Sequence, residues 1–142
     1  MLCTTFGTAK DVVNFAGYVA CNLLQGEFKQ VREKDIRNIV REKALIIDVR
    51  EKHEYELSHI IGAKNIPLSE LRDRINEIPK DEPVYLHCRS AQRSYNALKA
   101  LKNLGYENIY NVSGGFLGIS FYEYFNDITT EREKILTDYN FL

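Results

Sequence analysis

The stretch PVYLHCRSAQRSYNALKALKNLGY (residues 83–106) reads as a strand, a short polar loop and a helix in direct succession. Residues 83–88 are mostly apolar, as in a buried strand. Residues 91–104 follow the helical period, and Gly105 ends the pattern. Four apolar side chains share one face of that helix: Ala97, Leu98, Leu101 and Leu104. Cys88 therefore closes a strand and opens a loop that leads directly into a helix.

The same alternation extends over most of the chain. Further strands are predicted at residues 28–31, 44–49 and 107–112. Between them, Asp35 is a candidate cap for a helical turn, and Ser69 for a helix that ends before Pro79. The inward side chains of that second helix would be Leu71, Ile75 and Ile78. Alternating strands and helices predict an α/β fold with a mainly parallel sheet of about five strands, flanked by helices on both faces.

The first 27 residues differ from the rest of the chain. Residues 11–25 are mostly apolar on more than one helical face, and Gly26 ends the run. This pattern predicts an N-terminal helix that needs more than one partner surface. We therefore divide the chain into an N-terminal helical segment, residues 1–27, and an α/β domain, residues 28–142.

Composition excludes several classes of function. The 142 residues include 19 basic and 20 acidic side chains, a net charge of −1, which offers no basic stripe for nucleic acid. The longest apolar run, residues 15–21, is too short to span a membrane, and the N-terminus lacks the pattern of a signal peptide. Three widely spaced cysteines indicate a reducing compartment, and we expect the cytoplasm.

Cys88 is the strongest candidate for chemistry. Ligands of open α/β sheets collect at the carboxyl ends of the strands, where the following helix also presents its positive end. Backbone amides and two arginines after Cys88 would stabilise a thiolate and attract an anionic substrate. The predicted substrate-binding residues are Arg89, Ser90, Ala91, Gln92 and Arg93. The competing interpretation is a buried, apolar cysteine, but the polar and basic residues that follow it would make a poor core.

Several separated motifs resemble the rhodanese (sulfurtransferase) domain over residues 28–125. They are LIIDVREKHEYELSHIIGAKNIP (45–67), VYLHCRSAQRS (84–94) and the Gly114-Gly115 pair. The resemblance implies a six-residue loop opened by Cys88, the catalytic residue. It also implies that Cys88 takes a sulfane sulfur from thiosulfate, polysulfide or a persulfide, and passes it to a thiol or cyanide. Three features depart from the family pattern: Ser58, Ile61 and the lack of tryptophan.

Two other functions remain open at this stage. Cysteine-dependent phosphatases and arsenate reductases attack anionic centres from a similar loop, but with the pattern C-x5-R. Here Ser94 occupies the position of that arginine, and Arg93 comes one residue early. The second alternative is a non-catalytic rhodanese-like module that only docks a partner.

Other polar residues are interpreted as structural. Asp48, Arg50 and Glu54 form a charged trio that favours an internal salt bridge over a catalytic dyad. His87 precedes Cys88 on a strand, so its side chain should point to the opposite face, and His59 is interpreted as a hydrogen-bonded structural residue. No metal site is predicted, because the histidines lack ligand spacing with the cysteines. A solvated helix face is predicted for Glu51, Lys52, Glu54 and Glu56.

The N-terminal segment FGTAKDVVNFAGYVACNLLQGE (6–27) carries a second resemblance, to the end of the dimerisation domain of coenzyme A disulfide reductase and NADH oxidase-type flavoproteins. The closing TDYNF (137–141) is similar to their tail. No GxGxxG motif occurs, so we expect neither FAD nor NAD to bind by that route, and no other cofactor. The chain is expected to be a shortened tail of such an enzyme. The expected partners are a small-molecule sulfur donor, a thiol acceptor and a flavoprotein disulfide reductase domain.

Overall fold

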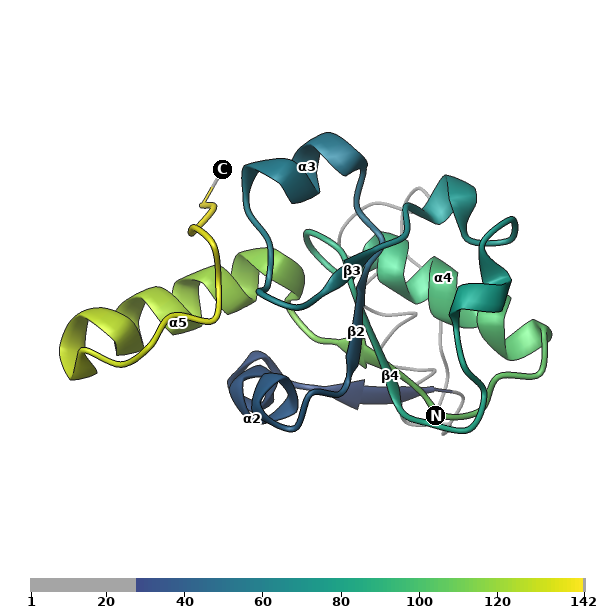
Figure 1. Ribbon diagram of the computed structural model, residues 1–142, viewed down its shortest axis with the longest axis horizontal. Coiled ribbons are helices and arrows are strands. Elements are labelled where there is room, and N and C mark those ends of the chain that lie inside the picture. The colour runs from purple at the N-terminus through teal and green to yellow at the C-terminus, as the bar shows by residue number, and fades with distance from the viewer. Residues whose placement is uncertain (1–27, 142) are drawn as a thin grey trace, which may run out of the picture.

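Five parallel strands form the sheet in the computed structural model, which describes residues 28–141 (Figure 1). They are β1 (Lys29–Val31), β2 (Leu45–Asp48), β3 (Lys64–Asn65), β4 (Val84–His87) and β5 (Ile109–Val112). Their spatial order is β1-β5-β4-β2-β3, and every neighbouring pair is parallel. The predicted α/β fold is confirmed. The predicted helix over 11–25, together with Cys3 and Cys21, lies outside the described residues.

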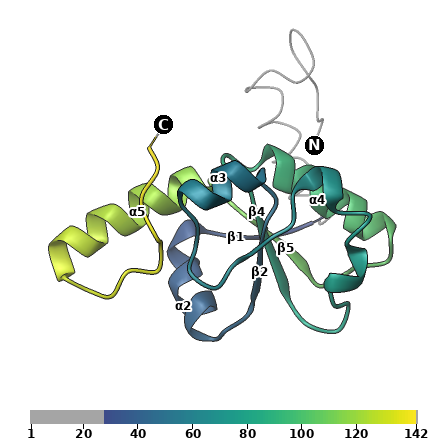
Figure 2. The same cartoon turned by 45° about the horizontal axis from the view of Figure 1, so that its top comes forward.

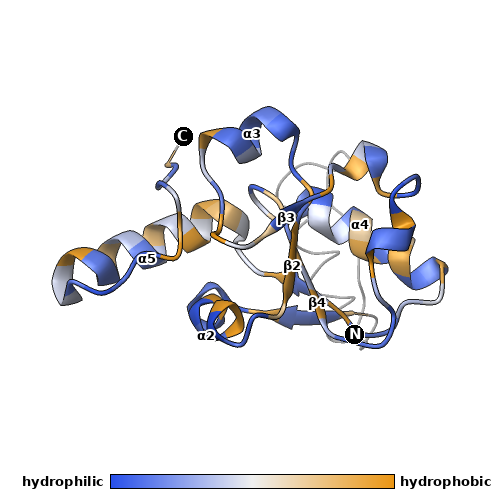
Figure 3. Ribbon diagram, in the orientation of Figure 1, coloured by the Kyte–Doolittle hydropathy of each residue, from blue (hydrophilic) through white to orange (hydrophobic). Residues whose placement is uncertain are grey.

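Strands β2 and β4 form the buried centre of the sheet. They pair in register from Leu45 opposite Val84 to Asp48 opposite His87. Successive side chains of a strand point to opposite faces, so these two strands supply both halves of the core. Ile47 belongs to the cluster on one face and Ile46 to the cluster on the other. In Figure 3 much of β2 and β4 is orange, as expected for strands that are covered on both faces.

Helices cover both faces of the sheet. The helix α4 (Gln92–Asn103) packs on one face through Ala97, Leu98 and Leu101. The helices α2 (Ile36–Arg41) and α5 (Gly115–Thr130) cover the other face, and α5 extends beyond the edge of the sheet (Figures 1 and 2). The short helix α3 (Lys52–Leu57) follows β2 at the carboxyl edge of the sheet and has no buried residue. A single turn, η1 (Glu33–Asp35), precedes α2.

The helix predicted to begin at Ser69 is wrong. The chain there forms two separate 3₁₀ turns, η2 (Leu68–Glu70) and η3 (Ile75–Glu77). An isolated helix of this length is marginal, and side chains from elsewhere satisfy the backbone carbonyls instead. The Tyr106 hydroxyl donates to the carbonyl oxygens of Ile75 and Ile78, at 3.2 and 2.8 Å. The apolar residues Leu71 and Ile78 are nevertheless buried as predicted.

The chain after α5 runs back toward the sheet. Leu136 forms an antiparallel bridge with Ile60, and the Thr137 amide donates to the carbonyl oxygen of His59 at 2.9 Å. Buried Arg37 of α2 forms ion pairs with Glu123 and Asp127 of α5. These contacts fix α5 and the tail to the domain. No helix within residues 28–141 has both the length and the apolar character needed to cross a membrane.

Candidate active site

Cys88 lies at the carboxyl end of β4, directly before a short loop and α4. Its side chain is buried, with 1% of the residue exposed. The Ala91 amide donates a hydrogen bond to Sγ at 3.1 Å. The Ser94 hydroxyl lies 3.5 Å from Sγ and 3.1 Å from the Ala91 carbonyl oxygen, and its single proton can be donated to either. Because α4 begins at Gln92, the sulfur also faces the positive end of a helix of 12 residues. The loop therefore surrounds the sulfur with hydrogen-bond donors.

The backbone of this loop turns sharply at Ala91. Its φ of +112° lies in the left-handed region, which costs an alanine about 1–2 kcal/mol. The turn directs the Ala91 amide at the sulfur. Of the five residues predicted to bind substrate, Ser90 and Gln92 are exposed, whereas Arg89, Ala91 and Arg93 are half-buried. The loop backbone is therefore strained close to Cys88.

The first turn of α5 is hydrogen-bonded to the backbone of the cysteine loop. The Phe116 amide donates to the carbonyl oxygen of Cys88 at 2.7 Å, and the Leu117 amide donates to that of Arg89 at 3.1 Å. Gly115 permits this approach, since a Cβ atom there would lie 2.5 Å from the Arg89 carbonyl oxygen. The Gly114-Gly115 pair therefore shapes the loop that carries Cys88.

Glu54 of α3 pairs with Arg93 of the loop. Its carboxylate accepts two hydrogen bonds from the guanidinium, at 2.6 and 2.9 Å. This hydrogen-bonded cation lowers the pKa of Glu54 to about 2. Glu54 also accepts the Glu51 amide at 2.9 Å, which caps α3. This differs from the predicted place of Glu54 in a trio with Asp48 and Arg50 and on a solvated face: its carboxylate pairs with Arg93, Arg50 acts on it only through its nearby charge, and its side chain is 22% exposed.

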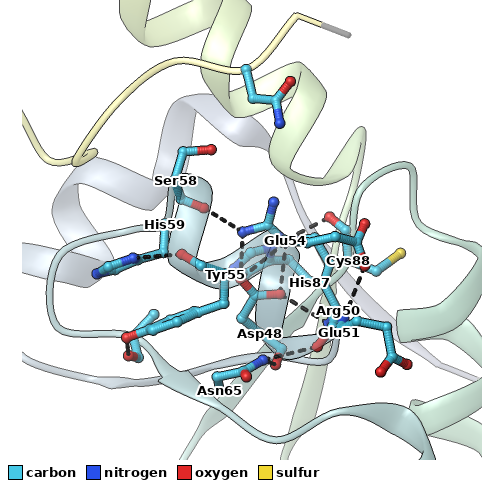
Figure 4. A network of polar contacts seen from close by, with 12 residues as sticks. Asp48, Arg50, Glu51, Glu54, Tyr55, Ser58, His59, Asn65, His87 and Cys88 are labelled. Atoms are coloured by element: carbon cyan, nitrogen blue, oxygen red, sulfur yellow. Dashed lines mark hydrogen bonds and ion pairs between the residues drawn. The ribbon is translucent and has the colours of Figure 1, made fainter.

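The other two members of that trio form a buried ion pair, as predicted (Figure 4). Arg50 donates to both carboxylate oxygens of Asp48, and its Nη2 also donates to the carbonyl oxygen of Ser58 at 2.8 Å. The guanidinium lies 4.2 Å from the ring centroid of Phe116. Burial opposes ionisation of Asp48, but the neighbouring His87 together with the hydrogen bonds and charge of Arg50 keeps its pKa below the ordinary value. The pair ties β2 to α5 beneath the cysteine loop.

His87 is a structural residue on the face opposite the Cys88 side chain, as the strand period predicts. Figure 4 shows the sulfur pointing away from the Asp48 network, whereas His87 faces it. His87 Nε2 lies 3.8 Å from Asp48, and Nδ1 lies 3.3 Å from the Cys88 carbonyl oxygen. Complete burial lowers the pKa of His87. His59 is structural as well, since its Nδ1 lies 2.8 Å from the Tyr55 carbonyl oxygen, within hydrogen-bond distance, and its ring stacks on that of Tyr55.

Residues 24–120 match the sequence model of the Rhodanese-like domain family, which covers the sheet and the whole cysteine loop. The chain belongs to the rhodanese-like family. This confirms the resemblance drawn from the motifs around Cys88.

The chain is also similar to several known proteins. The chain is 50% identical over 88 residues to the uncharacterized protein YqhL of Bacillus subtilis, which covers 62% of this chain and 69% of YqhL. It is 37% identical over 76 residues to a sulfurtransferase of Allochromatium vinosum, covering 54% of this chain and 71% of that protein. The crystal structure of reduced Bacillus anthracis CoADR-RHD superposes with a TM-score of 0.71 at 42% identity. That match covers 78% of this chain but only 20% of the CoADR-RHD chain.

Two contacts of the rhodanese-like loop, made by Ser94 and Glu54, were not predicted from the sequence. Ser94, which is fully buried and has its hydroxyl 3.5 Å from Sγ, was considered only as the residue in place of a phosphatase arginine. Its position in the first turn of the predicted helix was a usable signal, because that turn starts beside the sulfur. Glu54 gave no such signal, since it lies 39 residues before its partner Arg93.

Proposed function

We propose that this rhodanese-like domain is a sulfurtransferase that carries a sulfane sulfur on Cys88 as a persulfide. The observation that carries the proposal is the setting of the sulfur: Sγ receives a hydrogen bond from the Ala91 amide and lies beside the Ser94 hydroxyl, at the amino end of α4. Donors that point at Sγ stabilise the Cys88 thiolate, which attacks the sulfur donor in the first step and is released again in the second. Arg89 supplies positive charge to the loop for an anionic donor, whereas the charge of Arg93 is paired with Glu54.

The proposed reaction has two steps. The Cys88 thiolate attacks the outer sulfur of thiosulfate, a sulfur–sulfur bond forms on Cys88, and the bond to the sulfonate sulfur breaks to release sulfite. A thiolate or cyanide then attacks the outer sulfur of the Cys88 persulfide. The products are an acceptor persulfide or thiocyanate, and the original Cys88 thiolate. No electrons are gained or lost overall, so the chain needs no redox cofactor for this transfer.

A phosphatase is the weaker candidate. Its loop needs an arginine six positions after the cysteine, and this chain has the fully buried Ser94 there, with its hydroxyl 3.5 Å from Sγ. Arg93, one residue earlier, is bonded to Glu54 rather than extended over the loop. Both features favour a small sulfur over a tetrahedral phosphate.

Steady-state kinetics test the proposal. Thiosulfate and cyanide should yield thiocyanate with ping-pong kinetics, because donor and acceptor react in turn with one sulfur. Cys88→Ser should abolish the product, and the matched variant Cys21→Ser should retain it. Hydrolysis of an aryl phosphate that depends on Cys88 would favour the phosphatase. A wild-type protein that neither transfers sulfur nor hydrolyses phosphate would favour the docking module.

We further propose that a flavoprotein disulfide reductase domain is the partner of this domain. The match to about a fifth of the CoADR-RHD chain supports such a partner, because that chain carries a related domain among others. A thiol held by the reductase would act as the acceptor of the Cys88 sulfur. Mixing the persulfidated protein with such a reductase should move the sulfur to it, and transfer no faster than to a free thiol would refute the partnership.

A further inference from the structure

We infer that Glu54 is a specificity-determining residue for the sulfur donor, because it neutralises Arg93 and so disfavours dianionic donors relative to monoanionic ones. The inference rests on the proposed sulfur transfer from an anionic donor. It concerns the relative use of two donors rather than the existence of the activity.

The two arginines of the cysteine loop are in different electrostatic states. The Arg93 guanidinium forms a two-point ion pair with Glu54, at 2.6 and 2.9 Å. The Arg89 guanidinium has no ion-pair partner within residues 28–141. Of the two positive charges that the sequence places on the loop, one is therefore cancelled by a residue of α3. A donor that approaches Cys88 meets one net positive charge instead of two.

The Arg93–Glu54 ion pair is placed so that its charge can act on a bound donor. The side chains of Arg93 and Glu54 are 32% and 22% exposed, so solvent screens them only in part. Arg93 lies in the first turn of α4, next to Ser94, which contacts the sulfur. Thiosulfate carries two negative charges, whereas methanethiosulfonate carries one and delivers the same outer sulfur with a sulfinate as leaving group. The ratio of their kcat/KM values isolates the response to one unit of donor charge.

A purely structural role for Glu54 predicts something different. If the ion pair only joined α3 to the loop, loss of either partner would impair both donors alike. If the ion pair instead sets the charge near the sulfur, the loss of Glu54 and the loss of Arg93 change the preference between the two donors in opposite directions. Glu54→Gln frees a positive charge, and Arg93→Gln leaves a negative one. Glutamine retains an acceptor for the Glu51 amide, so the first variant keeps the cap of α3.

The test compares the thiosulfate-to-methanethiosulfonate ratio of kcat/KM across the full chain and its variants. For an assumed separation of roughly 8 Å between the altered charge and the second negative charge of the donor, and an effective dielectric constant of about 20–40, Coulomb's law gives a change of about five- to thirtyfold. Glu54→Gln should raise the ratio by that factor at low salt, and Arg93→Gln should lower it. The double variant should return near the wild-type ratio. Added salt should weaken each change.

Glu56→Gln is the matched control. It removes one negative charge from the same helix, but its side chain is 63% exposed and pairs with Lys52. It should leave the ratio within about twofold, since exposed charges are well screened. An unchanged ratio in Glu54→Gln, or a fall like that of Arg93→Gln, overturns the inference while wild-type transfer still supports the proposed function.

If the wild type transfers no sulfur from either donor, the proposed function fails and binding decides the inference. Calorimetric titration of both anions into Cys88→Ser, with and without Glu54→Gln, reports the same charge preference without any transfer. A relative gain in thiosulfate affinity supports the inference, and its absence refutes it.

Discussion

A Cβ atom on Gly115 would lie 2.5 Å from the carbonyl oxygen of Arg89. The first turn of α5 and the cysteine loop therefore pack backbone against backbone. Gly115 also has a φ of +59°, which glycine adopts without strain. This contact makes the shape of the loop depend on a residue 27 positions after Cys88.

Gly115→Ala should destabilise the fold by about 3 kcal/mol or more and lower sulfur transfer by about tenfold or more, because the methyl group displaces the loop backbone. Urea denaturation and thiocyanate production measure the two effects. Gly114→Ala is the control, since its φ of +77° is also left-handed but its Cβ would meet only ordinary contacts at 3.5 and 3.6 Å. That variant should cost about 1–2 kcal/mol and keep its turnover. Equal losses in both variants would show that the Gly115 contact does not position the loop.

Arg50→Met should lower the free energy of unfolding by about 3–5 kcal/mol, because Asp48 would remain as a buried, unpaired charge. Both side chains of this pair are at most 1% exposed. Lys52→Met, two residues later, removes an exposed lysine whose ion pair with Glu56 spans 3.9 Å. It should change the free energy of unfolding by less than about 1 kcal/mol. Similar costs in urea denaturation would contradict a special role for the buried pair.

His87 should make the folded protein sensitive to mild acid. Its folded pKa lies below the ordinary value of 6.5, so the unfolded chain binds the proton first as the pH falls. Its contribution to stability is thus complete above that value and decreases below it, by up to about 1.4 kcal/mol per pH unit. Urea denaturation from pH 7 to 5 should show a shallower decline for His87→Gln than for wild type. Replacing the exposed His53 of α3 by Gln should leave the wild-type slope, and identical slopes for all three proteins would refute the prediction.

The sheet and the cysteine loop could be predicted from local patterns. Apolar runs of four to six residues mark the buried strands, and the period after Cys88 marks α4. The segment after Ser69 misled the same reasoning, because its apolar spacing fits a helix while hydrogen bonds from Tyr106 satisfy its carbonyls in another conformation.

The contacts that complete the site could not be predicted in this way. Glu54 joins Arg93 across 39 residues of sequence, and the α5 amides of Phe116 and Leu117 reach the loop only after the chain has folded. Each depends on which elements the topology brings together. A charged residue on a short helix gives no sign of its partner until that arrangement is known.

Intact mass spectrometry shows whether Cys88 alone carries the transferred sulfur. Wild type and Cys88→Ser are each incubated with thiosulfate and freed of excess donor. Their intact masses are then measured before and after treatment with cyanide. We expect a gain of one sulfur atom, about 32 Da, on wild type only, because a thiolate and not an alcohol is the nucleophile, and we expect cyanide to remove it again. Equal labelling of Cys88→Ser, or a wild type that gains no sulfur, would contradict this expectation.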